Sequence, residues 1–342
     1  MAEAPCLLVK THAFGDAMLC TPPVRELLKK SEGPFWVLAG GSSAPVWERM
    51  PGIQELFVAP VPPSGTAENL SFLKWTLRHR RRLREVERSI VFQGSPVVRR
   101  WIRYLTGAPM RSVGGKPLGQ WEKVFPMEET EYAGLAYSRA AGVEPEDWKP
   151  VFSVTDSEKD WVESTGFTGP CFAVAPGGGR NPRDTVLEKR WMPDRFAAVA
   201  RELVSSGIKV VLVGGPADRG AAEEMQESCG APLLDMTGRT TWGQTAALLR
   251  KCTGFLGADS GAAHLAVAMD LPAVVLFGPS SPECLFAPGL VVPVRSRLKC
   301  SPCYSNSLFP GCGRSRPECM EDIDAERVLE AVREVIHQNY NA

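Results

Sequence analysis

The segment 257–269 holds the residue types best suited to chemistry, because Asp259, Ser260 and Gly261 directly follow a short apolar run. The side chain of Asp259 or Ser260 can cap a helix, and Gly261 lets backbone N–H groups approach a ligand closely. A helix N-terminus offers unpaired N–H donors and the positive end of its dipole, so it suits a phosphate or diphosphate. His264 falls in the first turn of the same predicted helix. The pattern indicates either an anion-binding turn or an ordinary capped helix.

The loop 10–16, between the first predicted strand and the first predicted helix, is a second candidate. Gly15 permits a tight turn, and Asp16 stands at the expected start of the helix. A carboxylate in this place can take a proton from an acceptor hydroxyl as a general base. His12 is a weaker candidate for the same task. The alternative is that Asp16 only caps the helix.

Glycine-rich loops follow two further predicted strands. Gly177 and Gly178 come after the strand that ends at 175, and three successive glycines there allow close approach of the backbone to a ligand. Lys189 and Arg190 precede the next predicted helix, where a cation can neutralise a diphosphate. In the second loop, Asp218 can accept from ribose hydroxyls, or it is a surface carboxylate near a helix N-terminus.

Eleven cations and only two carboxylates lie between residues 74 and 111, with aromatic residues among them. Arg99, Arg100 and Arg103 are the candidates within this basic block for binding an acceptor. The block suits a phosphorylated or carboxylated partner, or a membrane surface, although a solvated helix face is the commoner explanation. The formal net charge of zero and the lack of a nucleic-acid-reading motif argue against nucleic acid as a partner.

Four cysteines lie close together near the C-terminal end, at positions 300, 303, 312 and 319. Cys300, Cys303, Cys312 and Cys319 can supply four thiolates to zinc or iron in a tetrahedral site. Such a site leaves no open coordination position, so a metal here would be structural. The alternatives are a reduced loop, or disulfides in an exported protein.

The elements that position these residues alternate between short apolar runs and helical patterns, which predicts parallel sheets covered on both faces. We expect strands at 6–9, 35–38, 56–58, 89–92, 172–175, 209–213, 255–257, 273–277 and 290–294. We expect helices at 17–30, 72–88, 194–206, 219–229, 245–251, 262–269 and 324–338. The 342 residues suggest two domains. The rhythm restarts at 172, after a proline-rich and acidic stretch, so we place the domains at 1–160 and 161–323.

The composition is that of an ordinary globular protein, with 44% hydrophobic and 23% charged residues. No apolar run is long enough for a transmembrane helix, and the N-terminal residues do not resemble a signal peptide. The other cysteines are scattered in apolar or helical contexts and are expected to be buried thiols. A reducing cytoplasm is the simplest setting for them.

These motifs, taken in order, resemble glycosyltransferase family 9, the ADP-heptose:lipopolysaccharide heptosyltransferases. The resemblance runs from residue 7 to about 335. Its most specific part is 259–264 with Pro272 and the run 276–279, joined by the loop of Asp16, by 21–25, by 189–191 and by 211–215. The tail with Cys300, Cys303, Cys319 and Met320 is also similar to this family.

The resemblance implies a GT-B architecture, in which two Rossmann-like doubly wound domains face each other across a cleft. It implies an ADP-sugar donor in the C-terminal domain and an anionic glycolipid acceptor, such as the lipopolysaccharide inner core, against the N-terminal domain. The transfer would invert the anomeric centre without a catalytic metal or cofactor. The helix 324–338 would pack back on the first domain, and the Cys-rich segment 300–319 would belong to the second.

The resemblance also assigns roles to single residues. Asp16 matches the proposed base, Lys189 matches a cation on the donor phosphates, and Ser260 and Gly261 match the phosphate-binding turn. Asp218 falls where members of the family place a ribose-binding acid. The basic block fits an anionic lipid acceptor and peripheral contact with the inner membrane from the cytoplasm. Two alternatives remain: a nucleotide-sugar epimerase with the same fold, and a non-catalytic nucleotide-binding or metal-bound scaffold.

Overall fold

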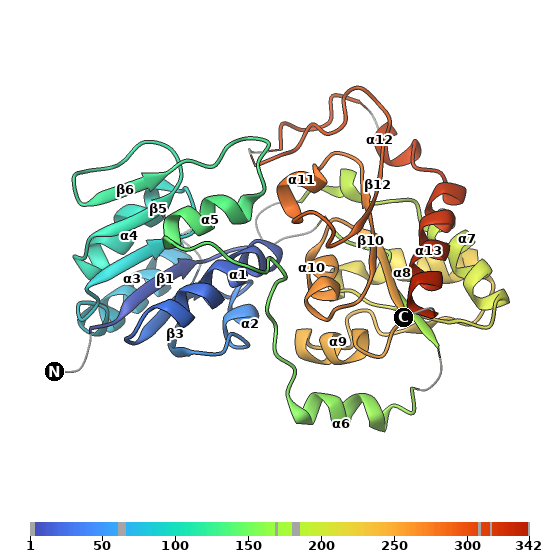
Figure 1. Ribbon diagram of the computed structural model, residues 1–342, viewed down its shortest axis with the longest axis horizontal. Helices are drawn as coiled ribbons and strands as arrows, with labels where there is room; N and C mark the ends of the chain where they lie inside the picture. The colour runs from blue at the N-terminus through green and yellow to red at the C-terminus, as the bar shows by residue number, and fades with distance from the viewer. Residues whose placement is uncertain are drawn as a thin grey trace. The chain divides into compact units, whose positions relative to one another are not determined.

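The computed structural model describes residues 4–60, 66–167, 170–179, 185–306, 309–314 and 317–340. The chain divides into two compact units, Met1–Val151 and Phe152–Ala342. The boundary lies before residue 160 because the helix α6 (Asp156–Ser164) packs against α9 (Trp242–Leu249) of the second unit. Figure 1 shows the element order by colour, from blue in the first unit to red at the C-terminal helix.

The first unit contains a parallel sheet with six strands in its described part, in the order β3-β2-β1-β4-β5-β6. Each neighbouring pair of strands is parallel. The chain moves outward from β1 in one direction and then returns to the other side of β1, so the topological switch point lies between β1 and β4. Loops that follow strands at a switch point are where ligands bind in such sheets. The strands are β1 (Cys6–Lys10), β2 (Phe35–Gly40), β3 (Ile53–Ala59), β4 (Arg88–Val91), β5 (Met110–Val113) and β6 (Glu122–Phe125).

Helices connect these strands, and their apolar faces close the core. On one side of the sheet, Leu7 and Val9 of β1 share a buried cluster with Trp101 and Ile102. The helix α1 packs against α5, and α3 packs against α4. The helices of this unit are α1 (Phe14–Lys30), α2 (Ala44–Trp47), α3 (Thr66–Leu83), α4 (Pro96–Thr106) and α5 (Ala133–Ala141).

The second unit repeats this plan, with the strand order β12-β11-β10-β7-β8-β9 among the residues that the structure describes. All neighbouring strands are again parallel, and the switch point lies between β10 and β7. The strands are β7 (Cys171–Ala175), β8 (Lys209–Leu212), β9 (Leu234–Asp235), β10 (Gly254–Ala258), β11 (Ala273–Phe277) and β12 (Val292–Arg295).

The helices of the second unit cover its sheet. Besides α6 and α9 they are α7 (Pro193–Ser205), α8 (Arg219–Cys229), α10 (Gly261–Ala268), α11 (Pro282–Leu285), α12 (Glu318–Glu321) and α13 (Ala325–Tyr340). Two 3₁₀ turns, η1 (Leu187–Lys189) and η2 (Pro216–Asp218), follow β7 and β8. None of the described helices is long and apolar enough to cross a bilayer.

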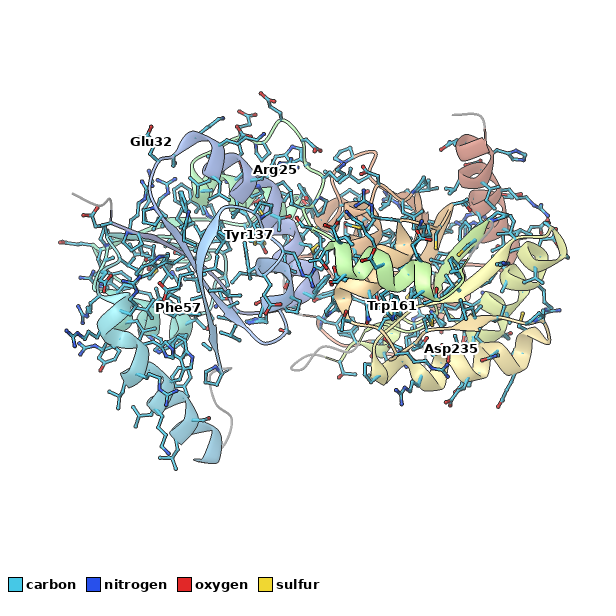
Figure 2. All side chains as sticks on the ribbon, turned by 90° about the horizontal axis from the view of Figure 1, so that it is seen from below. Arg25, Glu32, Phe57, Tyr137, Trp161 and Asp235 are labelled. Carbon is cyan, nitrogen blue, oxygen red and sulfur yellow. The ribbon has the colours of Figure 1, made fainter. Side chains whose placement is uncertain are left out.

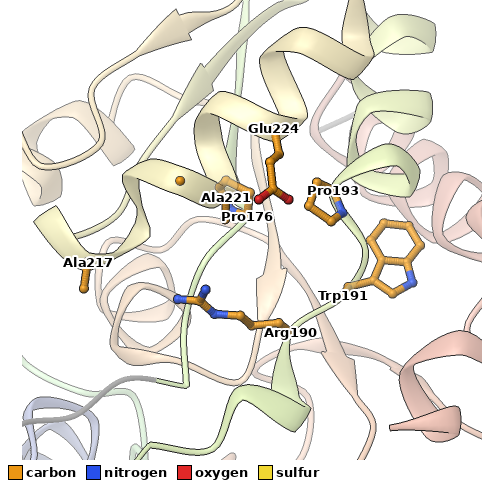
Figure 3. A pocket seen from close by; sticks show the side chains of 8 residues that line it. Pro176, Arg190, Trp191, Pro193, Ala217, Ala221 and Glu224 are labelled. Carbon is orange, nitrogen blue, oxygen red and sulfur yellow. The ribbon is translucent and has the colours of Figure 1, made fainter. Parts of the chain in front are cut away.

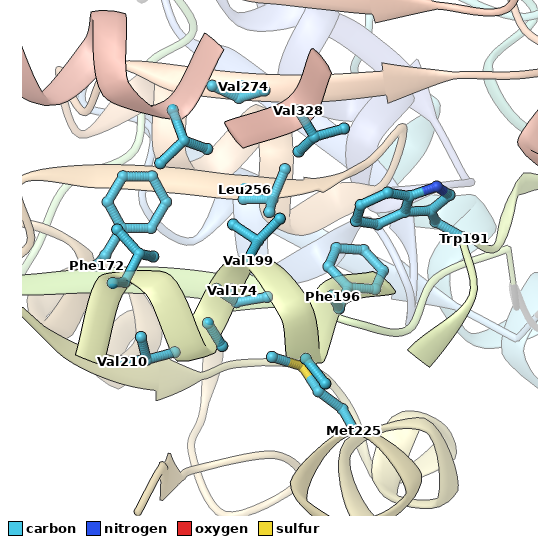
Figure 4. Close-up of a cluster of buried hydrophobic side chains, with 14 of the residues drawn as sticks. Phe172, Val174, Trp191, Phe196, Val199, Val210, Met225, Leu256, Val274 and Val328 are labelled. Carbon is cyan, nitrogen blue, oxygen red and sulfur yellow. The ribbon is translucent and has the colours of Figure 1, made fainter. Parts of the chain in front are cut away.

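The C-terminal helix α13 packs on the second unit. This differs from the expectation that the helix 324–338 packs back on the first domain. α13 contacts α7 and the strands β10, β11 and β12. Its Val328, Val332 and Val335 are fully buried in the cluster that also holds Phe172 and Trp191. Figure 4 shows Val328 facing this cluster. The reason is the spacing of the three valines, which places them on one helix face that needs an apolar partner.

Candidate functional site

In the second unit, four charged side chains pair at the C-terminal ends of β7, β8 and β10, around the switch point. Lys189 Nζ lies 2.5 Å from Asp259 Oδ2, and only 14% and 6% of these side chains are exposed. The Lys189 ammonium also lies over the ring of Tyr304, 4.7 Å from its centroid. A cation held in this way keeps its position but retains donor capacity for an anionic ligand.

The second pair ties the glycine-rich loop after β7 to η2. Asp218 Oδ1 accepts from the Gly178 backbone N–H at 2.9 Å and lies 3.2 Å from Arg190 Nη2. Arg190 Nε donates to the Gly178 carbonyl at 2.8 Å. Gly177 is required at its position, since a Cβ there would stand 2.2 Å from Asp218 Oδ1. The Asp218 carboxylate therefore organises the loop, in addition to any role toward a ribose.

The helix α10 begins beside this loop, as the sequence predicts. Ser260 is its N-cap residue, but its side chain does not cap the helix. The Ser260 Oγ is buried and has no hydrogen-bond partner in the part of the chain that the structure describes. A Cβ on Gly178 would lie 3.5 Å from the Ser260 Cβ, so the glycine-rich loop passes close to the start of α10. A free hydroxyl at a helix N-terminus is suited to an anion.

His264 lies in the first turn of α10, as the motif predicts, but it is buried. Its ring is 2% exposed and stacks on Phe286, with 4.4 Å between ring centroids and 12° between the ring planes. This stacking links α10 to the end of α11. We therefore propose that His264 holds α10 in place through its packing on Phe286.

A hollow of about 360 Å³ lies next to these groups and is lined by Arg190, Trp191 and residues of η2 and α8. Figure 3 shows the Arg190 side chain reaching toward Ala217, with Glu224 on the opposite wall. Lys189, Asp259 and Ser260 do not line it. Among the residues proposed to bind the donor, Arg190 both lines the hollow and pairs with Asp218.

In the first unit, the loop after β1 leads into α1 at the other switch point. Asp16 lies in the first turn of α1, and its Oδ2 accepts from the Ala13 backbone N–H at 3.3 Å. The same Oδ2 lies 3.8 Å from Lys10 Nζ, and 45% of the Asp16 side chain is exposed. The carboxylate thus accepts from the N-cap residue of the helix and also remains accessible, so its role as a cap does not prevent contact with a ligand.

Lys10 is a buried cation that the sequence analysis did not select. Its side chain is 6% exposed, and Nζ donates to the Tyr137 hydroxyl at 3.2 Å. Burial lowers the pKa of Lys10, but Tyr137, Asp16 and Cys20 together raise it above the ordinary value. The ammonium therefore stays charged at neutral pH and faces Asp16. A lysine at the end of an otherwise apolar strand is the sequence signal that could have found it.

Neighbouring loops hold the rest of this segment. The Thr11 backbone N–H and hydroxyl both donate to Gln93 Oε1, at 3.0 and 3.1 Å. His12 is partly exposed, and its Nδ1 lies 3.0 Å from Thr11 Oγ1. Gln93 follows β4, so these bonds join the two loops that flank the switch point of the first sheet.

The three arginines expected to bind an acceptor differ in their surroundings. Arg99 is buried, and its Nη1 lies 2.7 Å from Glu122 Oε1. Glu122 also accepts from Ser112 Oγ and from the Leu118 N–H, so this network anchors the loop before β6. Arg103 donates to the Gly107 carbonyl at the end of α4, and Arg100 is exposed. We assign Arg99 to the structure of that loop, and Arg100 is the most accessible of the three.

The structure thus contains two parallel Rossmann-like sheets. At the switch point of the first sheet lies the Asp16 carboxylate, and at the switch point of the second lies a helix N-terminus suited to bind an anion. A family model described as glycosyltransferase family 9 (heptosyltransferase) matches residues 127–307, which is more than half of the chain. The chain belongs to glycosyltransferase family 9.

A curated relative agrees with the family 9 assignment, and solved structures share the fold. Lipopolysaccharide heptosyltransferase 2 of Salmonella typhimurium is 28% identical over 227 residues, which cover 63% of each chain, so the match spans somewhat less than two thirds of that relative. The structure of the E. coli ADP-heptose lps heptosyltransferase II matches with a TM-score of 0.75 and 23% identity, covering 98% of this chain and 99% of the other. A family 9 glycosyltransferase from Veillonella parvula matches with a TM-score of 0.77 and 20% identity over 98% of both chains. The expected GT-B fold is confirmed.

The cysteine segment of this family 9 protein lies beside the pair of Lys189 and Asp259, because Tyr304 of the segment contacts Lys189. The Cys303 and Tyr304 backbone N–H groups donate to the Pro279 carbonyl, and this places the Tyr304 ring under Lys189. Burial raises the pKa of Cys319 to about 11, with the thiols of Cys303, Cys312 and Cys300 adding to it. Among the described residues, no three His, Cys, Asp or Glu side chains are arranged to hold a metal ion. The donor types fit zinc or iron, but the arrangement observed is not that of a formed site.

Proposed function

We propose that this family 9 protein transfers a heptose from ADP-heptose to a hydroxyl of a lipopolysaccharide glycolipid, with inversion at the anomeric carbon. The observation that supports it most is the unpartnered Ser260 hydroxyl at the start of α10, next to the Lys189–Asp259 pair. The similarity to lipopolysaccharide heptosyltransferase 2 supports the choice of sugar and acceptor class.

On the donor side, the diphosphate would lie at the N-terminus of α10. The backbone N–H groups of the first turn and the Ser260 hydroxyl would donate to it, and Lys189 would neutralise its charge. Such donors stabilise the negative charge that develops on the leaving ADP. Asp218 and Gly178 would hold the loop that faces the nucleotide, with Arg190 between them.

On the acceptor side, Asp16 would remove the proton from the attacking hydroxyl. The Lys10 ammonium, 3.8 Å away, keeps a positive charge beside the carboxylate. His12 and the exposed Arg100 are the groups proposed to contact the anionic acceptor. This mechanism uses no metal or other cofactor in the transfer itself.

We propose a structural role for the four cysteines. Zinc or iron bound by Cys300, Cys303, Cys312 and Cys319 would stiffen the segment that carries Tyr304, and so the support under Lys189. No step of the transfer passes through such a metal.

A test of the donor site compares the thermal stabilisation of the protein by ADP, UDP, GDP and CMP at equal concentration. A ligand that binds only the folded state, present at a hundredfold excess over Kd, adds about 2.7 kcal/mol to the free energy of unfolding. We expect selective stabilisation by ADP, weakened in Lys189→Ala and unchanged in Lys159→Ala, a lysine on α6. Preference for UDP would favour another activity of the same fold, such as the epimerase. No response to any of the four nucleotides would favour the scaffold.

A further inference from the structure

Gln93 connects the two loops at the switch point of the first sheet through only one end of its side-chain amide. Its Oε1 accepts from both the backbone N–H and the hydroxyl of Thr11, at 3.0 and 3.1 Å. Because a backbone N–H can only donate, these bonds identify Oε1 as the atom that faces Thr11. The Gln93 Nε2 is buried and has no hydrogen-bond partner among the residues that the structure describes.

The unpaired Nε2 makes Gln93 a costly residue for the core of the first unit. Gln93 is 7% exposed, and a buried donor without a partner lowers the stability of a fold. A side chain that breaks a rule of stability in this way is typical of functional sites. The glutamine at position 93 therefore points to a task other than stability, and the contacts of Oε1 show where that task lies.

Thr11 is the first residue of the loop that carries Asp16. The Thr11 hydroxyl also lies 3.0 Å from His12 Nδ1. Further along the loop, Asp16 Oδ2 accepts from the Ala13 backbone N–H at 3.3 Å. Gln93 thus holds the beginning of a short segment that ends at the carboxylate, so a shift of Thr11 would be passed on to Asp16.

The loops after β2 and β5 support this contact from the two sides. A Cβ on Gly40, at the end of β2, would stand 2.2 Å from the Thr11 carbonyl oxygen. A Cβ on Gly114, just after β5, would stand 2.9 Å from the Gly94 Cα. Only glycine permits such close approach of two backbones. The loop of Thr11 and the loop of Gln93 are therefore each packed against a neighbouring loop.

The residue before Gln93 supports the other charged group of this site. Phe92 is fully buried, and its ring meets the Tyr137 ring edge-on, with 5.8 Å between centroids and 77° between planes. The Tyr137 hydroxyl accepts from Lys10 Nζ at 3.2 Å. Figure 2 shows Tyr137 inside the first unit, next to α1. Two successive residues after β4 therefore support both the Lys10 ammonium and the loop of Asp16.

We propose that Gln93 is a positioning residue, which holds the loop 11–16 so that the Asp16 carboxylate keeps its place at the switch point. Gln93 acts through Thr11 and takes no part in the chemical step. This role rests on the proposed function of Asp16 as the base and deepens it, because it names the contact on which the geometry of the base depends. A misplacement of about 1 Å can lower turnover by about a hundredfold, so loss of the contact should be visible in kcat.

Hydrogen–deuterium exchange of the full chain, followed by mass spectrometry, tests this role without any turnover. Gln93→Met has nearly the same length but offers no acceptor to Thr11, so the amides of 11–16 should exchange about fivefold faster or more. Exchange in β1 and in the second unit should stay as in the wild type, which shows that the variant is folded. The matched control is Gln120→Met, the same change at an exposed glutamine of the first unit, and it should exchange like the wild type.

Kinetics with ADP-heptose and a lipopolysaccharide glycolipid that lacks heptose separate positioning from a purely structural role. The kcat of Gln93→Met should fall by about tenfold to a hundredfold at unchanged ADP affinity, because the proposed donor site lies in the second unit. Thr11→Val removes only the hydroxyl bond and should lose less, whereas Thr11→Ser should retain most of the turnover. The double variant Gln93→Met, Thr11→Val should lose little more than Gln93→Met, because both changes act through one contact.

Two results would overturn the proposal. One is equal exchange of the amides of 11–16 in Gln93→Met and the wild type, and the other is faster exchange with unchanged kcat. If Gln93→Met does not fold, Thr11→Val and Thr11→Ser test the same contact by the same two measurements. Absence of turnover in the wild type would refute the proposed transfer instead, and the exchange comparison alone would then support or overturn the role of Gln93.

Discussion

Replacing Asp16 with Asn separates the chemical role of this residue from its structural role. Asn has the same size as Asp and still offers an oxygen to the Ala13 N–H, so the start of α1 is kept. It removes the negative charge 3.8 Å from the buried Lys10 ammonium and also removes the basicity of the side chain. The two losses have different consequences, and their sizes can be compared.

The structural loss is the smaller one. At 3.8 Å and an effective dielectric constant of about 20, the attraction between Lys10 and Asp16 is about 4 kcal/mol. Because 45% of the Asp16 side chain is exposed to water, we halve this to about 2 kcal/mol. Domains are stable by about 5–15 kcal/mol, so the variant stays folded. Loss of a general base lowers turnover by about a hundredfold or more, which is about 2.7 kcal/mol in the barrier.

The assay measures kcat and KM for the transfer, the ADP affinity by calorimetry and the melting temperature by circular dichroism. We expect Asp16→Asn to lose turnover by about a hundredfold or more, with a modest drop in melting temperature and nearly unchanged ADP affinity. Asp147→Asn is the control, since Asp147 is an exposed carboxylate that pairs with Arg25 at 3.2 Å in the same unit. Turnover of Asp16→Asn within threefold of the wild type would refute Asp16 as the base.

Three further predictions concern the second unit. Lys189→Ala should weaken ADP binding by about tenfold to a hundredfold, because a charge-assisted hydrogen bond contributes about 1.5–3 kcal/mol. Lys189→Arg should retain most of the ADP affinity. If calorimetry finds equal ADP affinities for Lys189→Ala and the wild type, Lys189 is not part of the donor site. The Arg297 N–H, opposed by burial and helped by Ser296, lowers the pKa of Asp322 below its ordinary 3.8. The ionised Asp322 therefore stabilises the fold above pH 3.8, and this stabilisation is lost as the pH falls below that value. The difference in melting temperature between the wild type and Asp322→Asn should shrink below pH 3.8. A difference that does not change with pH would contradict this prediction. The structural role proposed for the four cysteines requires that they bind a metal, so elemental analysis of protein purified without chelators should find about one zinc or iron per chain. The double variant Cys303→Ser, Cys312→Ser should lose this metal, and only traces in the wild type would contradict the proposal.

The strands and the two switch points were within reach of the sequence, because buried parallel strands appear as short apolar runs. The nine expected strands all correspond to observed ones. Three strands were missed: β5 (Met110–Val113), which has four residues and includes Arg111; β6, which contains Glu122 and Lys123; and β9, which has only two residues. The helix α4 was missed because Arg99 and Arg100 obscure its apolar face, although Pro96 at its first position is a common start.

The pairings within the candidate site were out of reach. Lys189 and Asp259 are 70 positions apart, and no local pattern specifies their contact. The same is true of Lys10 with Tyr137, which are separated by 127 positions. Arg99 lies in a sequence rich in cations, which is typical of a protein surface. Only the fold shows that it is buried and paired with Glu122. Local motifs therefore located the loops, and tertiary packing decided which side chains are accessible.

The most direct test of the account is the transfer itself. Purified protein is incubated with ADP-heptose and a lipopolysaccharide glycolipid that lacks heptose, and the acceptor is analysed by mass spectrometry. The account predicts an acceptor heavier by one heptose residue and release of ADP, with both formed about a hundredfold or more slowly by Asp16→Ala. An acceptor of unchanged mass, from protein that binds ADP and melts cooperatively, would contradict the proposed heptosyl transfer.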